Sequence, residues 1–212
     1  MKQDNIYVNV ASSDYVLENY INYDFHIFLL LSYLPIPSSF FFKYKSFIDR
    51  FRSARKKAKL LFRNCKSPLP LPDLSVSHIL CSHFLEHNFY DEAENILINF
   101  KKKLKVGGTL HLVVPNLDGY IDEYIASREN EDLAALKLCE RTILTSRTKP
   151  SFVFRFLNFV GLFGLKHDVM FNKKLLESLC VKVGFKLTDK NSMHSSNFIS
   201  HDPGSIHVYA VK

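Results

Sequence analysis

Seven short segments of the chain are rich in apolar, β-branched and aromatic residues, and polar residues, glycine or proline bound each of them. This pattern is typical of strands that lie half or fully buried in a sheet. The segment "VSHILCS" is apolar enough to be buried on both faces, with His78 as the exception. The predicted strands are residues 5–11, 20–24, 59–64, 76–82, 109–116, 185–190 and 205–212.

Helical periodicity separates several of these strands. Residues 90–104 carry an apolar stripe and end in lysines, with Gly107 and Gly108 just beyond, and a helix over 172–185 is predicted to stop at Gly184. Strands that alternate with helices predict an α/β fold with a doubly wound, mostly parallel sheet and helices on both faces. Such a sheet binds ligands at the carboxyl ends of its strands.

A basic helix is predicted over residues 39–59. Its apolar residues recur at steps of three and four, and Ser38 or Ser39 is available as the N-terminal cap. Between Lys43 and Lys66 there are ten basic residues against one acidic residue, a net charge of +9, so the rest of the chain is slightly acidic in a protein of net charge +7. We expect the charged face to contact either solvent or an anionic membrane surface. No stacking platform accompanies the charge, so nucleic acid is not expected as a partner.

Composition sets the broad class of the protein. With 212 residues and 47% apolar content, one domain with a sizeable core is the default. The four cysteines are scattered without a CxxC pair, which suits a reducing compartment. The amino terminus lacks the pattern of a secretion signal, and the apolar runs "FHIFLLLSYLP" and "FVFRFLNFVGLFGL" are too short or too interrupted to span a bilayer. The sequence therefore predicts a cytoplasmic protein.

The stretch "CSHFLEHNFY" contains His83, Glu86 and His87 in the spacing HxxEH. On a helix, the two histidines would share one face and could bind zinc with Glu86 as the base, as in the inverted zinc proteases. Here the motif follows directly on a predicted buried strand, and no downstream carboxylate ligand is evident. We therefore expect no metal at this motif and interpret Glu86 as a helix-start carboxylate that interacts with the helix dipole.

In and just before the segment 73–116, the chain carries the motifs "LPLPDLSVS", "HFLEH", "LKVGG" and "LVVPN". In order and spacing, these motifs resemble the second half of class I S-adenosylmethionine (SAM)-dependent methyltransferases. The stretches "VNVASSDYVLENYINYD" and "HDVMFNKKLLESLCVKVGF" are similar to a type 11-like subgroup associated with polysaccharide biosynthesis. The resemblance implies one Rossmann-like methyltransferase domain over 1–212, with a helical insertion or lid around 118–165.

The resemblance also implies a SAM site at the strand ends. The family's first loop is glycine-rich and brings backbone close to the cofactor, whereas this chain has small residues there, which would be strained at positive φ. Asp24 corresponds to the acid that binds the ribose hydroxyls, and Asn64 stands where an aspartate commonly meets the adenine amine. The residues so assigned to cofactor binding are Ala11, Ser12, Ser13, Asp24, Asn64, Cys65, Ser82 and His83.

The same resemblance places His83 and His87 beside the methyl group and its acceptor. If the acceptor is a hydroxyl, a neutral imidazole of either residue could take its proton as the methyl group is transferred. The alternative is that His87 only caps the following helix or lines the pocket. The implied function is methyl transfer from SAM to a small acceptor such as a sugar or a lipid-linked glycan. The alternative from another class is a catalytically inactive, methyltransferase-like scaffold, motivated by the missing glycines and by Asn64.

Overall fold

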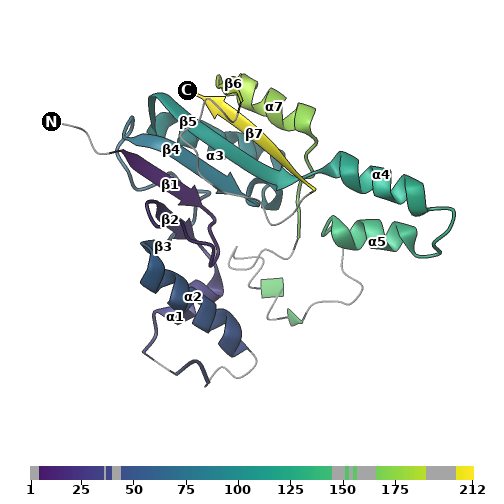
Figure 1. The fold of residues 1–212 in the computed structure, drawn as a ribbon, viewed down its shortest axis with the longest axis horizontal. Coiled ribbons are helices and arrows are strands. Elements are labelled where there is room, and N and C mark those ends of the chain that lie inside the picture. Colours follow the sequence, from purple (N-terminus) through teal and green to yellow (C-terminus); the bar gives the residue numbers. More distant parts are fainter. Residues whose placement is uncertain are drawn as a thin grey trace.

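The protein is described by a computed structural model that covers residues 5–35, 37–39, 44–144, 151–152, 155–156, 166–189 and 204–212. Its centre is a seven-stranded sheet with strand order β3-β2-β1-β4-β5-β7-β6 (Figure 1). All seven predicted strands are confirmed: β1 (Ile6–Val10), β2 (Ile21–Asp24), β3 (Leu60–Phe62), β4 (Val76–Ser82), β5 (Leu104–Pro115), β6 (Lys186–Thr188) and β7 (Ser205–Val211).

Strands β1 to β5 are mutually parallel, whereas β7 runs antiparallel to both β5 and β6. The sheet is therefore mostly parallel, and its chain order reverses between β1 and β4. Open α/β sheets bind their ligands at such a switch point, beyond the carboxyl ends of the strands. The doubly wound α/β fold predicted from the sequence is confirmed.

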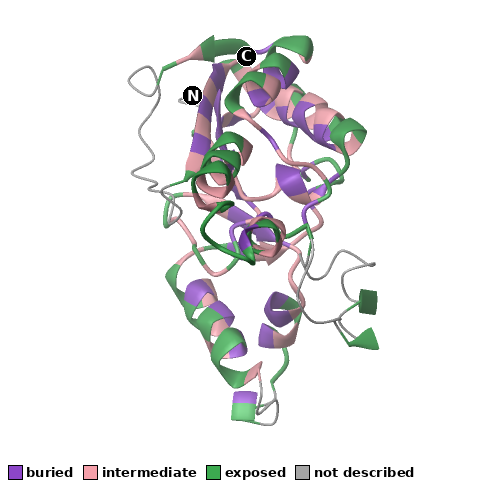
Figure 2. Ribbon diagram, turned by 90° about the vertical axis from the view of Figure 1, so that its right-hand side faces the viewer, coloured by how far each residue is buried: buried purple, intermediate pink, exposed green. Residues whose placement is uncertain are grey.

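Two predicted helices cover the sheet close to their expected bounds. Helix α3 (Tyr90–Lys103) buries the apolar stripe identified in the sequence, and α7 (Lys173–Lys182) ends before Gly184, whose φ of 87° favours glycine. Figure 2 shows buried residues concentrated in the strands and on the sheet-facing sides of these helices. The buried residues of α3 are Ala93, Ile96, Leu97 and Phe100.

The basic helix is shorter than the sequence predicted. Helix α2 (Lys45–Lys57) has Tyr44 as its N-cap, so neither Ser38 nor Ser39 caps it, and residues 40–43 lie outside the described part. It packs against α1 (Ile27–Ser32), a helix that the sequence pattern did not predict. Because "FHIFLLLSYLP" is apolar throughout, it has no periodicity from which a helix could be recognised.

Helices α4 (Leu117–Ser127) and α5 (Ala134–Arg141) fall within the range expected for an insertion and lie beside the sheet rather than over it (Figure 1). Residues 145–150 ("TSRTKP") and most of the aromatic run after them lie outside the described residues. No helix in the described ranges has the length and apolar content to cross a bilayer.

One burial prediction is wrong. His78 in β4 was expected to break the burial of that strand, but its side chain is fully buried. Its Nδ1 lies 2.7 Å from the Thr109 hydroxyl on the adjacent strand β5. A buried imidazole is tolerated when it is hydrogen-bonded, and Thr109 provides the partner that the sequence pattern of β4 alone does not show.

Candidate functional site

The residues assigned to the SAM site gather at one edge of the sheet. Ala11 follows β1, Asp24 ends β2, Asn64 lies two residues after β3, and Ser82 ends β4. Because these four strands are parallel neighbours, their carboxyl ends lie on the same side. The predicted positions therefore lie along one edge of the sheet, on both sides of the switch point between β1 and β4.

The loop after β1 has the backbone conformation that glycine would favour. Ala11 has a φ of 54° and Ser13 a φ of 49°, so two side-chain-bearing residues occupy the left-handed region. The loop is nonetheless well anchored, because the Ser12 amide donates to the Tyr23 carbonyl at 3.1 Å and the Tyr15 amide donates to the Ser12 carbonyl at 2.9 Å. A left-handed conformation costs about 1 kcal/mol or more for a non-glycine residue.

Asp24 is tied to this loop through its carboxylate. The Ser13 amide donates to one carboxylate oxygen and the His26 amide donates to the other, each at 2.8 Å. The residue is buried, with 7% of its surface exposed, and burial raises the pKa of its carboxyl to about 6 against the opposing effect of these amides. Asp24 is therefore mainly ionised at pH 7. Each carboxylate oxygen also has further acceptor capacity.

Cys65 and Asn64 follow β3 and differ in character, since the first is a buried thiol and the second has a hydrogen-bonding side chain. Burial raises the pKa of the Cys65 thiol to about 12, and the Ala11 backbone and Asp24 carboxylate are close enough to influence it. A thiol of that kind is an inert, small apolar group that packs under the loop. Asn64 Oδ1 accepts a hydrogen bond at 3.0 Å from the Lys66 amide and still has a second lone pair.

His83 lies immediately beyond β4 and has a φ of 51°. Its amide donates to the Val113 carbonyl at 2.9 Å, which fixes it to the end of β5. Its Nε2 lies 3.2 Å from the Ser205 hydroxyl, and its Nδ1 lies 3.3 Å from Glu86 Oε1. The side chain is 37% exposed, so this imidazole is held by the protein but reaches solvent at the strand edge.

The HxxEH motif does not lie on an α-helix. Leu85–His87 form the single 3-10 turn η2, and α3 begins three residues later at Tyr90. His83 precedes the turn, so the motif lacks the regular helical face of the inverted zinc proteases. Glu86 lies in the first turn of η2 rather than at the start of α3, and it is fully buried. Its interaction with a helix dipole stays a prediction.

A third histidine, His167, joins this motif from a distant part of the sequence. The chain around it lies beside η2, because the amides of Asp168 and Val169 both donate to the Glu86 carbonyl, at 2.8 and 3.2 Å. His87 Nδ1 lies 2.9 Å from the Lys166 carbonyl. The rings of His87 and His167 are 4.8 Å apart in a near-perpendicular arrangement. Burial lowers the pKa of His167, and the Glu86 carboxylate opposes that effect.

The sequence assigned no role to His167. The one available signal was the segment "HDVM", which begins with this residue and belongs to the carboxyl-terminal resemblance. Nothing in the local pattern connects it to His87, eighty positions earlier, because the contact arises from tertiary structure.

A small cavity of about 10 Å³, roughly the space of one water molecule, lies between α4 and α5. It is lined on one side by Tyr120 and Tyr124, and the Arg141 guanidinium lies over the Tyr120 ring. Arg141 also forms an ion pair with Glu123 across the two helices. Helices α4 and α5 therefore pack against each other, and none of the predicted site residues lines the cavity between them.

Comparison with known proteins identifies the fold. No family model and no curated protein matches the sequence. Among solved structures, a SAM-dependent methyltransferase from Thermotoga maritima is 15% identical and superposes with a TM-score of 0.51, covering 99% of this chain and 83% of its own. A SAM-dependent methyltransferase from Archaeoglobus fulgidus is 13% identical, with a TM-score of 0.53 and coverage of 100% and 87%.

The PH0226 protein from Pyrococcus horikoshii OT3 is also similar, with 13% identity, a TM-score of 0.52 and coverage of 100% and 83%. At these identities the likeness concerns the fold. The chain thus has the Rossmann-like fold of class I SAM-dependent methyltransferases, as the resemblance in its motifs implied.

Proposed function

We propose that this protein is a SAM-dependent methyltransferase that binds its cofactor at the carboxyl edge of β1 to β4. The observation that carries the proposal is the contact between Ser13 and Asp24. It joins a left-handed loop after β1 to a buried carboxylate at the end of β2, at the switch point of a sheet with the methyltransferase strand order. A vicinal diol is a suitable ligand for a carboxylate whose two oxygens retain acceptor capacity.

In this proposal the ribose of SAM binds to Asp24, and the backbone of Ala11 to Ser13 lies against the methionine portion. Asn64 accepts a hydrogen bond from the adenine amine through the second lone pair of its side-chain oxygen. Cys65 supports the loop from below, which agrees with its burial. Ser82 and His83 border the sulfonium from β4.

The candidate proton acceptors are His83 and His87. His87 Nδ1 lies 2.9 Å from a backbone carbonyl, which can only accept, so the neutral ring carries its proton there and has a lone pair on Nε2. His83 lies between Ser205 and Glu86 at the exposed end of β4. General base assistance contributes about 10²- to 10⁴-fold, and the remainder of the rate comes from aligning the acceptor with the methyl group.

The proposed acceptor is a hydroxyl of a sugar or a lipid-linked glycan, following the resemblance to the polysaccharide-associated subgroup. The protein is proposed to meet this acceptor at the surface of an anionic membrane. Several cations of α2 have protein partners: Arg50 pairs with Asp14 at 2.6 Å, and the Arg55 guanidinium lies 3.6 Å from the Tyr33 ring centroid. Membrane contact would therefore depend on exposed Lys56 and Lys57, and a Lys56→Gln/Lys57→Gln double variant should bind anionic vesicles more weakly.

Calorimetric titration with SAM and with S-adenosylhomocysteine tests the proposal. We expect saturable binding with one site per chain, and no heat of binding at millimolar cofactor would favour the scaffold function. The informative variant is Asp24→Asn, because it keeps an acceptor for one of the Ser13 and His26 amides, whereas Asp24→Ala leaves both without one. Asp24→Asn should weaken SAM binding about tenfold while leaving the circular dichroism spectrum unchanged.

The acceptor is tested by incubating the protein with SAM carrying a labelled methyl group and a panel of sugar and glycan hydroxyl acceptors. Labelled product should form with a hydroxyl acceptor and fall on the order of 100-fold in His83→Gln. Cofactor binding without transfer to any of these acceptors would contradict the glycan assignment and leave SAM binding intact.

A further inference from the structure

Glu86 is a buried carboxylate that lacks the partners such a group normally has. Glu86 is fully buried, and neither of its carboxylate oxygens accepts a hydrogen bond from any residue in the described part of the chain. His83 Nδ1 is near Oε1 at 3.3 Å, but without hydrogen-bond geometry. Isolating a carboxylate from water costs several kcal/mol unless a counter-charge or hydrogen bonds compensate.

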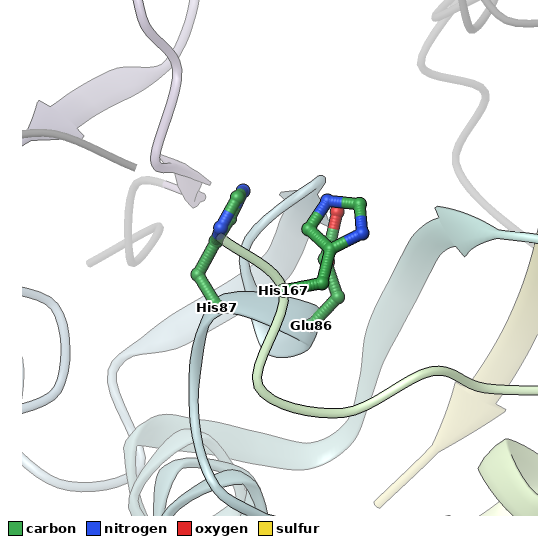
Figure 3. A group of neighbouring side chains, drawn as sticks. All are labelled: Glu86, His87 and His167. Carbon is green, nitrogen blue, oxygen red and sulfur yellow. The ribbon is translucent and has the colours of Figure 1, made fainter. Parts of the chain in front are cut away.

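The neighbours of Glu86 are imidazoles that present nitrogen atoms. One ligand atom from each of Glu86, His87 and His167 lies within 4.8 Å of the other two. His167 Nδ1 is buried without a hydrogen-bond partner among the described residues, although the Thr142 backbone is close enough to the ring to raise its pKa against the effect of burial. Figure 3 shows the three side chains extending to the same side of the segments that carry them, with Glu86 next to the His167 ring.

We propose that Glu86, His87 and His167 form a binding site for a divalent transition-metal ion of the zinc type. Two imidazoles and one carboxylate are a recurrent ligand set for zinc and for non-haem iron. A cation would neutralise the Glu86 carboxylate and satisfy the unpartnered His167 nitrogen at the same time. A single bound ion would therefore provide a partner for both the Glu86 carboxylate and the His167 nitrogen.

The surroundings of the ligands agree with this assignment. Metal-bound histidines usually donate their other ring N–H to a carbonyl, and His87 Nδ1 has the Lys166 carbonyl at 2.9 Å, which leaves Nε2 for the metal. With the ion bound, His83 is the remaining candidate proton acceptor. The backbone bonds from Asp168 and Val169 to the Glu86 carbonyl hold the two ligand-bearing segments side by side. Ligands of a tetrahedral zinc ion are roughly 3.4 Å apart, so the side chains must draw together by about 1 Å on binding.

The proposed metal site differs from the zinc site of the inverted zinc proteases in the identity of its second histidine. That zinc site would pair His83 with His87 on one helical face, whereas the fold places His167 beside His87 and leaves His83 at the strand edge. Three protein ligands leave a fourth position open to water or to an oxygen of the acceptor. Only the statement about the acceptor rests on the proposed function.

The test uses the full chain after treatment with EDTA and removal of the chelator. Titration with Zn²⁺ should show one tight site per chain, and Co²⁺ should give the visible absorption of a protein-bound, low-coordinate ion. Glu86→Gln and His167→Asn should each weaken Zn²⁺ binding on the order of 100-fold, since each removes a ligand. His207→Asn is the matched control, because His207 belongs to another close imidazole pair, 3.0 Å from His111.

Equal Zn²⁺ affinity in His167→Asn and the unmodified chain would overturn the assignment, as would loss of binding in His83→Asn or His207→Asn alone. Circular dichroism of each metal-free variant checks that the fold is retained. SAM titration in the presence of EDTA reports separately on the proposed cofactor site, so failure of the metal site and failure of the methyltransferase function give different results.

Discussion

Asp24 and Glu86 are two buried carboxylates at the same edge of the sheet, and they differ in the hydrogen bonds that they accept. Both oxygens of Asp24 accept backbone amides at 2.8 Å, whereas neither oxygen of Glu86 accepts a hydrogen bond within the described ranges. The first is stabilised by the protein itself and organises the loop after β1. The second has the imidazoles of His87 and His167 beside it. The comparison distinguishes the acid that we propose binds the cofactor from the acid that we propose binds a metal ion.

The comparison is tested most strongly by truncating each acid. Asp24→Ala leaves two inward-facing amides without an acceptor and should lower the free energy of unfolding by about 2–4 kcal/mol. Glu86→Ala breaks no hydrogen bond and removes a carboxylate whose ion-pair partner is His83 at 3.3 Å, so in EDTA it should lower the free energy of unfolding by less than Asp24→Ala does, by about 1 kcal/mol or less. Urea denaturation at pH 7 measures both. Similar losses for the two variants would contradict the difference between the acids.

The pH dependence of stability sharpens the account of Asp24 and its neighbour His26. Burial lowers the pKa of His26 to about 4, so the folded state binds its proton less readily than the unfolded state. Stability from this group is present above pH 6.5 and is lost as the pH falls toward 4, by on the order of 2–3 kcal/mol. The raised pKa of Asp24 acts in the opposite direction, adding stability as the pH falls from 6 toward 3.8.

His26→Asn separates these contributions, because Asn can also accept the Phe28 amide at the start of α1. Since Asp24 is common to both proteins, it cancels in their difference. The variant should therefore gain about 2–3 kcal/mol relative to the unmodified chain between pH 7 and pH 4. Urea denaturation across this range gives the difference, and a difference that does not change with pH would show that His26 is not buried in its neutral form.

The affinity for SAM should depend on the protonation of Asp24. The ribose hydroxyls donate to the ionised carboxylate, and the pKa of Asp24 is about 6, so protonation competes with binding below that pH. Between pH 7.5 and pH 5 the dissociation constant should rise about tenfold, as measured by calorimetry. Asp24→Asn should bind weakly and show no such dependence. An equally steep pH profile in this variant would remove Asp24 from the cofactor site.

The smallest effect concerns the loop after β1. Ala11→Gly relieves a φ of 54° and should raise the free energy of unfolding by about 0.5–1 kcal/mol, since glycine adopts this conformation without steric cost. The matched control is Ala126→Gly in α4, where the same change should destabilise by about 1 kcal/mol because the residue is helical. Thermal unfolding of both variants provides the measurement. Destabilisation by Ala11→Gly would mean that the loop conformation is not left-handed.

Local patterns predicted the elements of this fold well where their period was clear. The seven strands and α3 follow from alternation and from an apolar stripe, whereas α1 was missed because its sequence is apolar on all sides. The start of α2 was placed too early, because the apolar periodicity begins near Phe40 in the sequence, whereas the helix begins at Lys45.

The candidate site also has one part that the sequence predicted and one part that it did not. Asp24 and the residues after β1, β3 and β4 were identified because a parallel sheet brings its strand ends together whatever the loops contain. The burial of Glu86 and its contact with His167 depend on where the segment after α5 crosses η2. No periodicity or capping pattern encodes that crossing, so this cluster emerges only from the three-dimensional structure.

The central claim is that SAM binds at the carboxyl ends of β1 to β4. Chemical-shift mapping of the amides of the EDTA-treated protein during titration with SAM tests it most directly. We predict that the largest shifts fall on Ala11 to Ser13, Asp24 to His26, Asn64 and Ser82, with small changes in α4 and α5. Shifts concentrated in the α4–α5 cavity, or none at saturating cofactor, would contradict the account.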